Sequence, residues 1–98
     1  MATEHASVVR VARFRPASGK REALLSRLQG GVDGIRQRDG CFGAQVCGMR
    51  EDADLIVVIS RWASQAALEK FLSDTATERA GAAELTQAAP TTETFVSI

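Results

Sequence analysis

The stretch that decides the fold is residues 54–71, which read Asp-Leu-Ile-Val-Val-Ile-Ser-Arg-Trp-Ala-Ser-Gln-Ala-Ala-Leu-Glu-Lys-Phe. Five apolar residues run without a break from Leu55 to Ile59, and the only tryptophan, Trp62, follows where the strand pattern gives way to a helical one. Because successive side chains of a strand point to opposite faces, this strand is apolar on both faces. A strand with one face in water would alternate apolar and polar residues. The stretch therefore predicts a strand covered on both sides.

The composition limits the class of protein. A chain of 98 residues forms one domain with a thin core. Twelve Lys plus Arg balance 12 Asp plus Glu, so charge gives no reason to propose nucleic acid or an anionic membrane as partner. Signal-peptide and membrane-spanning patterns are both absent from the sequence. We expect a cytoplasmic protein with a disordered N-terminus at residues 1–6 and a single domain at residues 7–98.

Apolar spacing along the chain predicts elements in the order βαββααβ. Ser18 and Ser64 are candidate N-caps of the first two helices, and Thr75 with Glu78 forms the capping-box pattern of a third. Three glycines interrupt the first helix and predict a bend, or a helix pressed closely onto the sheet. The expected strands are residues 7–15, 42–50, 55–62 and 92–98, the third helix is residues 76–88, and the three glycines are Gly30, Gly31 and Gly34. One four-stranded antiparallel sheet with the helices on one face, an α+β fold, accommodates this order most economically.

The two-faced strands also predict an assembly. The first strand, like the third, carries apolar side chains on both sides, with Ala12 and Phe14 opposite Val9 and Val11. Left exposed, the second face would be a larger apolar patch than monomers usually carry. We expect a homodimer with its sheets face to face; the alternative is that the tails of the same chain cover this face.

The metal-binding residue types are sparse. Cys41 and Cys47 lie on or beside one predicted strand, where six residues span about 20 Å, too far for a disulfide. Neither has the spacing or the histidine neighbours of a zinc site. The only histidine is His5, in the segment expected to be disordered. We expect two free thiols and no metal site.

Several short motifs, in this order and spacing, resemble the antibiotic biosynthesis monooxygenase family of the dimeric α+β barrel superfamily. They are Pro-Ala-Ser-Gly-Lys at 16–20, Arg-Asp-Gly-Cys-Phe-Gly at 38–43, Glu-Asp at 51–52, Trp-Ala-Ser at 62–64 and Ala-Leu-Glu at 67–69. The resemblance implies a ferredoxin-like monomer that pairs sheet to sheet and holds a pocket between its sheet and helices. Some members oxidise aromatic polyketides or quinols with O2 and no cofactor, and others degrade haem.

The resemblance directs attention to aromatic and basic side chains near the pocket. Trp62 matches the tryptophan at the strand end that lines the pocket in several members, and an indole offers a stacking wall and one N–H donor. The alternative is core packing for each aromatic residue, and an exposed or dimer-paired position for each arginine. The expected ligand-binding residues are Trp62, Phe14, Phe42, Phe71, Arg13 and Arg61.

The departures from the family pattern leave the activity open. The chain has no tyrosine and no asparagine, and the helix after Trp62 has no histidine, which argues against haem ligation. No catalytic residue can be named. The preferred hypothesis is a cofactor-independent monooxygenase acting on a small aromatic or quinol substrate. The alternatives are a non-catalytic small-ligand-binding or stress-related dimer of the same fold, and a regulatory amino-acid-binding module, against which the extra third helix counts.

Overall fold

Four strands and three helices follow one another in the predicted order βαββααβ. The computed structural model describes residues 7–98, so the expectations for residues 1–6, including His5, lie outside the described residues. The elements are β1 (Val8–Phe14), α1 (Arg21–Arg36), β2 (Cys41–Met49), β3 (Asp52–Trp62), α2 (Gln65–Asp74), α3 (Ala76–Ala83) and β4 (Thr91–Val96). The third helix ends at Ala83, short of the predicted residue 88.

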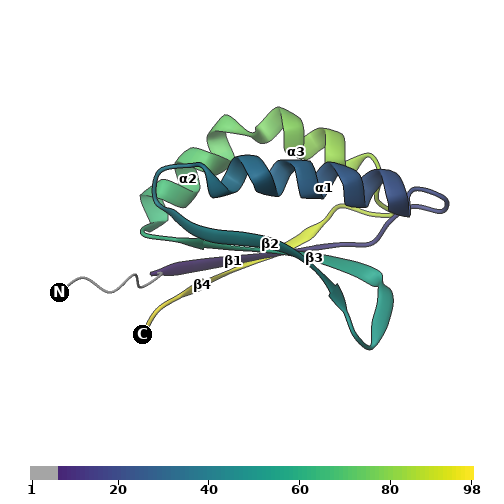
Figure 1. The fold of residues 1–98 in the computed structure, drawn as a ribbon, viewed down its shortest axis with the longest axis horizontal. Helices are drawn as coiled ribbons and strands as arrows, with labels where there is room; N and C mark the ends of the chain where they lie inside the picture. The colour runs from purple at the N-terminus through teal and green to yellow at the C-terminus, as the bar shows by residue number, and fades with distance from the viewer. Residues whose placement is uncertain (1–6) are drawn as a thin grey trace.

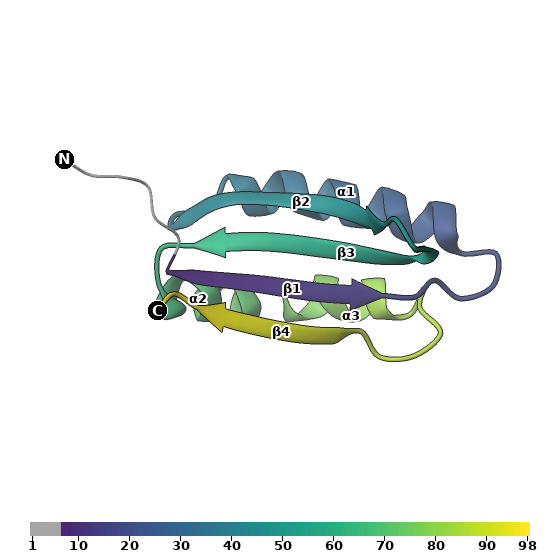
Figure 2. The ribbon, with the colours of Figure 1, turned by 90° about the horizontal axis from the view of Figure 1, so that it is seen from below.

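The strands form one antiparallel sheet in the order β2-β3-β1-β4. All three helices lie on the same face of this sheet (Figure 1). Seen from the other side, the four strands are uncovered, with α1 behind β2 and with α2 and α3 behind β1 and β4 (Figure 2). The predicted α+β, ferredoxin-like fold is confirmed.

The core lies between the sheet and the helices and has two clusters. In the first, Leu24, Leu28 and Val32 of α1 pack on Ile56 and Val58 of β3. In the second, Trp62 and Val8 pack on two residues of α2, Leu68 and Phe71. The apolar face of α1 therefore packs on the inward-facing side chains of β3, as the helical and strand periodicities predict.

The opposite face of the sheet is the open one. Val57 and Ile59 of β3 point there and lie opposite Cys47 and Gln45 of β2, while Val9 of β1 lies opposite Phe95 of β4. Phe95 is 53% exposed, and Val57 and Ile59 are partly exposed. No helix within residues 7–98 covers this face (Figure 2). Within the same residues, no helix is long and apolar enough to cross a membrane.

Of the two serine caps predicted for the first two helices, one is confirmed and one is not. The Ser64 hydroxyl caps α2 by accepting from the Ala67 N–H at 3.1 Å, as predicted. Ser18 does not cap α1, which begins after Lys20 without a side-chain cap. Gly40 has a left-handed conformation, with φ +80°, and lies in the turn between the C-cap of α1 at Gln37 and the start of β2. A Cβ on Gly40 would come within 2.7 Å of the Ala67 Cβ, so both the turn and the approach of α2 require glycine.

The third cap prediction was wrong in a way that matters for the site. Thr75 precedes α3 but makes no capping bond. Its hydroxyl instead donates to the Phe71 carbonyl at 2.7 Å and accepts from Nε of Arg79 at 3.3 Å. The Thr75 hydroxyl therefore does not cap the N-terminus of α3, and it helps to orient the side chain of Arg79 instead.

Candidate functional site

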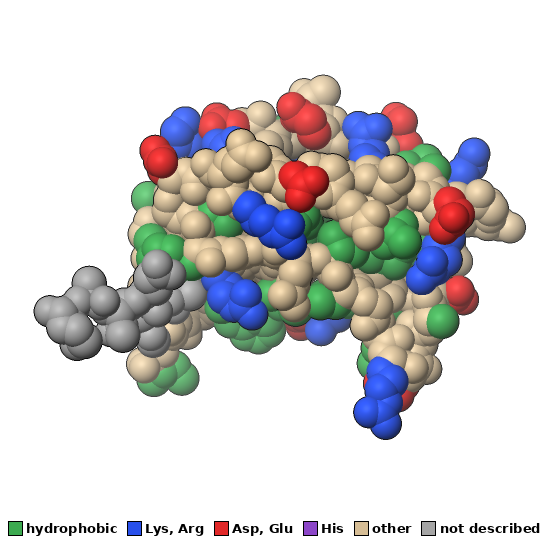
Figure 3. Space-filling view, viewed as in Figure 1, with side chains coloured by type: hydrophobic (Ala, Val, Ile, Leu, Met, Phe, Trp, Pro, Cys, Tyr) green, Lys and Arg blue, Asp and Glu red, His purple; other side chains and the backbone are tan. Residues whose placement is uncertain are grey.

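A cavity of about 580 Å³ lies between the covered face of the sheet and the helices. Its volume falls within the range of small-molecule sites in proteins. Apolar side chains make most of its wall: Ala12, Phe14, Leu28, Val32, Ile35, Val58, Phe71 and Ala82. Figure 3 shows hydrophobic side chains in the band between the helix layer and the sheet, with charged side chains spread over the helix surface.

The α1 side of the cavity is bounded by glycines. Gly30, Gly31 and Gly34 all line it, and a Cβ added at any of the three would meet nothing within 4 Å. Of the two alternatives predicted from these glycines, a bend or a close approach of α1 to the sheet, the close approach is therefore wrong. Their missing side chains leave space, so the three glycines enlarge the cavity at the expense of helix stability.

The polar part of the lining is basic. Four arginines, Arg10, Arg27, Arg38 and Arg79, border the cavity, and Glu78 is the one carboxylate among the lining residues. The Nη2 of Arg27 lies 3.5 Å from the backbone carbonyl of Glu78. The lining thus carries an excess of positive charge, although the whole chain is neutral.

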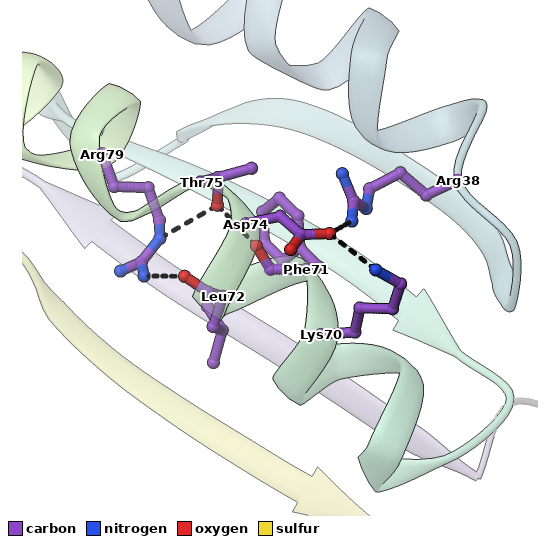
Figure 4. Close-up of polar contacts among 7 residues, drawn as sticks. All are labelled: Arg38, Lys70, Phe71, Leu72, Asp74, Thr75 and Arg79. Atoms are coloured by element: carbon purple, nitrogen blue, oxygen red, sulfur yellow. Dashed lines mark hydrogen bonds and ion pairs between the residues drawn. The ribbon is translucent and has the colours of Figure 1, made fainter.

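Arg38 lines the cavity, and a carboxylate balances its charge. Its guanidinium pairs with the Asp74 carboxylate, which also accepts from the Lys70 ammonium at 3.1 Å (Figure 4). The hydrogen bonds from Lys70 and Arg38 lower the pKa of Asp74. The Arg38 guanidinium also lies 5.6 Å from the centre of the Phe71 ring, a cation–π contact.

The side chain of Arg79 is fixed by hydrogen bonds to Leu72 of α2 and to Thr75, which precedes α3. Its Nη2 donates to the Leu72 carbonyl at 2.6 Å and its Nε to the Thr75 hydroxyl at 3.3 Å (Figure 4). These bonds leave Nη1 without a hydrogen-bond partner among residues 7–98. The guanidinium is therefore fixed in direction and retains unused donors.

Arg10 lies on the cavity side of β1, opposite the buried Ser60 of β3. Within the part of the chain that the structure describes, no carboxylate or carbonyl accepts a bond from its guanidinium. Burial, and secondly the nearby positive charge of Arg79, lower the pKa of Arg10. Arg10 and Arg79 thus line the same cavity, and neither forms an ion pair with a carboxylate of residues 7–98.

Of the six residues expected to bind ligand, two line the cavity and four do not. Phe14 and Phe71 line the cavity, whereas Trp62, Phe42, Arg13 and Arg61 do not. Trp62 is completely buried; its indole N–H donates to the Ser60 hydroxyl at 2.9 Å, and its ring stacks behind Phe71. Ligand binding by these six stays a prediction, and the geometry favours Phe14 and Phe71.

The other three lie away from the cavity for identifiable reasons. Arg13 points to the open face and pairs with Glu93 of β4. Arg61 lies opposite Gly43 on that same face and is exposed. An irregularity between Cys41 and Gly43 leaves Phe42 without a partner in the β2–β3 ladder and 41% exposed.

The sequence reasoning missed Arg10 and Arg79 as site residues. A signal for Arg10 was present, since it belongs to the inward row of β1 between Val8 and Ala12, which are both buried. A charged residue in such a row needs a reason to be there. For Arg79 there was no comparable signal, because its contribution depends on how α3 lies over the sheet.

Comparisons with known proteins agree with this fold. A family model described as "Antibiotic biosynthesis monooxygenase" matches residues 7–83. The structure is similar to Rv0793 from Mycobacterium tuberculosis, with 24% identity, a TM-score of 0.85 and coverage of 93% of this chain and 94% of that one. It is also similar to a candidate antibiotic biosynthesis monooxygenase from Deinococcus radiodurans, with 14% identity, a TM-score of 0.85 and coverage of 93% and 92%. No curated protein sequence matches the chain.

Proposed function

The chain belongs to the antibiotic biosynthesis monooxygenase family, and on that premise we propose that it is a cytoplasmic, cofactor-independent oxygenase for a small aromatic or quinol substrate. The observation that carries this proposal is the cavity of about 580 Å³, with its apolar wall and few polar groups. Such a cavity is large enough for a flat bicyclic or tricyclic ring system. Phe14 and Phe71 supply aromatic surfaces for stacking.

In a cofactor-free oxygenation the substrate itself supplies the electrons. An activated methylene group between aromatic rings becomes a carbonyl when one oxygen atom of O2 enters the product and the other leaves as water with the two hydrogens. No external reductant is needed for this balance. The protein's contribution is to hold the ring, exclude bulk water and stabilise the negative charge that develops on the substrate.

The protein is further proposed to work as a homodimer whose sheets pack face to face. Members of the family generally dimerise. Support comes from the open sheet face, where Val9, Val11, Val57, Ile59 and Phe95 would otherwise face water. An isologous pairing would cover this face in both copies and leave the cavity, on the other side of the sheet, free for substrate.

One observation favours the alternative of a non-catalytic ligand-binding protein. Apart from the arginines, the polar side chains that line the cavity are Glu78, Thr75 and Thr92. Thr75 is already engaged by Phe71 and Arg79. Glu78 is the one carboxylate of this set, and the set contains no tyrosine or histidine to move a proton, so binding without turnover is the second candidate.

The test is a titration of the protein with quinols and anthrones, following Trp62 fluorescence and oxygen uptake together. Trp62 is a usable reporter because its ring stacks on Phe71, which lines the cavity. Saturable quenching with protein-dependent oxygen uptake supports the oxygenase. Quenching without uptake supports the binding protein instead, and the absence of both for every compound would exclude the proposed substrate class.

A further inference from the structure

We propose that the ligand of this cavity is an organic anion, a flat apolar body whose carboxylate, phenolate or enolate oxygen is bound between the guanidinium groups of Arg10 and Arg79. This inference deepens the proposed function and rests on it in taking the cavity as the substrate site. It adds the two side chains that would bind the anionic oxygen, which the fold alone does not specify.

The first argument is the state of Arg10. Its neighbours on the inward side of β1, Val8 and Ala12, are 2% and 1% exposed, so Arg10 extends from an otherwise apolar row. Among residues 7–98 nothing accepts a hydrogen bond from it. A partly buried charge without a partner is costly, and an anion that entered the cavity would remove that cost.

The second argument is the orientation of Arg79. Two hydrogen bonds, to the Leu72 carbonyl and the Thr75 hydroxyl, fix its guanidinium before any ligand arrives. Nη1 then remains to donate. A guanidinium that is already oriented loses little side-chain freedom on binding, so more of the interaction energy appears as affinity.

The carboxylates near the cavity do not neutralise Arg10 and Arg79 in place of a bound anion. Asp74 forms ion pairs with Arg38 and Lys70 and does not line the cavity. Glu78 is in no ion pair within residues 7–98 and is exposed on α3, while Arg27 reaches only its backbone carbonyl. Arg27 also lines the cavity without a carboxylate partner within residues 7–98, but it is exposed. Arg10 and Arg79 are therefore the partly buried pair whose charge remains for a bound anion.

This arrangement also bears on chemistry. Guanidinium groups that bind the anion favour the deprotonated form of an acidic phenol or ketone, so the substrate proton can leave to solvent without a dedicated protein base. The anion is the form that transfers an electron to O2. In the balanced conversion, a diaryl-stabilised carbanion that retains one hydrogen reacts with one O2 to give the diaryl ketone and one hydroxide ion. A lining that lacks tyrosine and histidine is compatible with that route.

The test compares two probes of the same shape, 2-naphthoate and 2-naphthylmethanol, by calorimetric titration without oxygen turnover. The variants are Arg10→Gln and Arg79→Gln. The matched control is Arg13→Gln, on the same strand but on the open face. The wild type and Arg13→Gln are expected to bind the anion roughly tenfold or more tightly than the alcohol. Arg10→Gln and Arg79→Gln are expected to lose that preference.

Salt gives a second readout that needs no variant. Higher ionic strength is expected to weaken naphthoate binding to the wild type and to leave the alcohol unchanged. This readout and Arg10→Gln keep the test decisive if Arg79→Gln, which loses two structural hydrogen bonds, fails to fold. Equal affinity for the two probes, an unchanged preference in Arg10→Gln, or no naphthoate binding at millimolar concentration would overturn the inference.

The outcomes separate this inference from the proposed function. Charge-dependent naphthoate binding with no oxygen uptake for any quinol or anthrone would retain the anion site and remove the oxygenase. Oxygen uptake with charge-independent binding would retain the oxygenase and remove the anion site.

Discussion

Trp62 stacks on Phe71 with ring centroids 5.1 Å apart and planes inclined by 26°, and of the two rings only Phe71 reaches the cavity. The tryptophan thus supports the wall of the site from behind. Its indole N–H is already bonded to the Ser60 hydroxyl, and both side chains are buried. The position of Trp62 at the end of β3 links the core to the candidate site without direct contact with a ligand.

Trp62→Ala is therefore expected to lower the free energy of unfolding by about 3–5 kcal/mol, as for other large-to-small core substitutions. Trp62→Phe keeps the stacking surface and loses the bond to Ser60, so the expected cost is about 1–2 kcal/mol. Urea denaturation measures both. Affinity of folded Trp62→Phe for 2-naphthoate should stay within about twofold of wild type; a tenfold loss would place the indole in contact with ligand.

Neighbouring valines on β3 give a matched test of the dimer. Val57 points to the open face and Val58, 7% exposed, to the helices. Val57→Asp is expected to yield a folded monomer by light scattering, since the charge would face the partner. Val58→Asp is expected to cost several kcal/mol and unfold most of the protein, because it buries a charge in the core. A Val57→Asp variant that remains dimeric would remove the face-to-face assembly.

The glycines of α1 are expected to lower the stability of the protein while they leave room in the cavity. Gly34→Ala is expected to raise the free energy of unfolding by up to about 1 kcal/mol, because a Cβ there meets nothing within 4 Å. Gly34→Leu is expected to fill part of the cavity and weaken 2-naphthoate binding at least tenfold. The control is Gly19→Ala, which is expected to destabilise the protein because its φ is +74°. Full affinity in Gly34→Leu would contradict the assigned boundary of the cavity.

Arg10→Met should stabilise the protein in the absence of ligand. The substitution removes a partly buried charge that has no partner within residues 7–98, and the expected gain is roughly 1 kcal/mol. Thermal unfolding measures it, with Arg13→Met as the control that instead breaks the exposed pair with Glu93. A lower melting temperature for Arg10→Met would indicate that the guanidinium has a structural role of its own.

Asp74 should contribute to the pH dependence of stability. Lys70 and Arg38 lower its pKa in the folded protein. Its contribution is therefore present above the unfolded pKa of about 3.9 and is lost as the pH falls through the lower folded value. The stability of Asp74→Asn relative to wild type is expected to recover between about pH 5 and pH 2 in urea denaturation, whereas a constant difference would show that the carboxylate is not coupled to its partners.

The strands and helices could be predicted because their patterns are local. The alternation of Ile56, Val58 and Trp62 with Leu55 and Val57 indicated a strand with two apolar faces, and the structure shows that strand. The boundaries were less accurate where tertiary contacts decide them. Thr75, for example, matched a capping box, but its hydroxyl bonds to Phe71 and Arg79 instead.

The candidate site could be predicted only in part. Phe14 and Phe71 were named from the sequence and line the cavity. Arg13 and Arg61 were also named, and the fold turns both away from the cavity, whereas Arg10, on the inward row of β1, was not singled out. Strand alternation predicts that Arg10 and Arg13 point to opposite faces of the sheet. It does not predict which of these faces the helices cover.

The sequence by itself determined the order βαββααβ and the two apolar faces of the central strands, because these follow from the periodicity of side chains along a single segment. Only the tertiary structure decided that Arg10 of β1 and Arg79 of α3 face one cavity, and that three glycines of α1 keep it open. Those relations join residues far apart in the chain. Their geometry depends on how the helices pack on the sheet, which no local pattern contains.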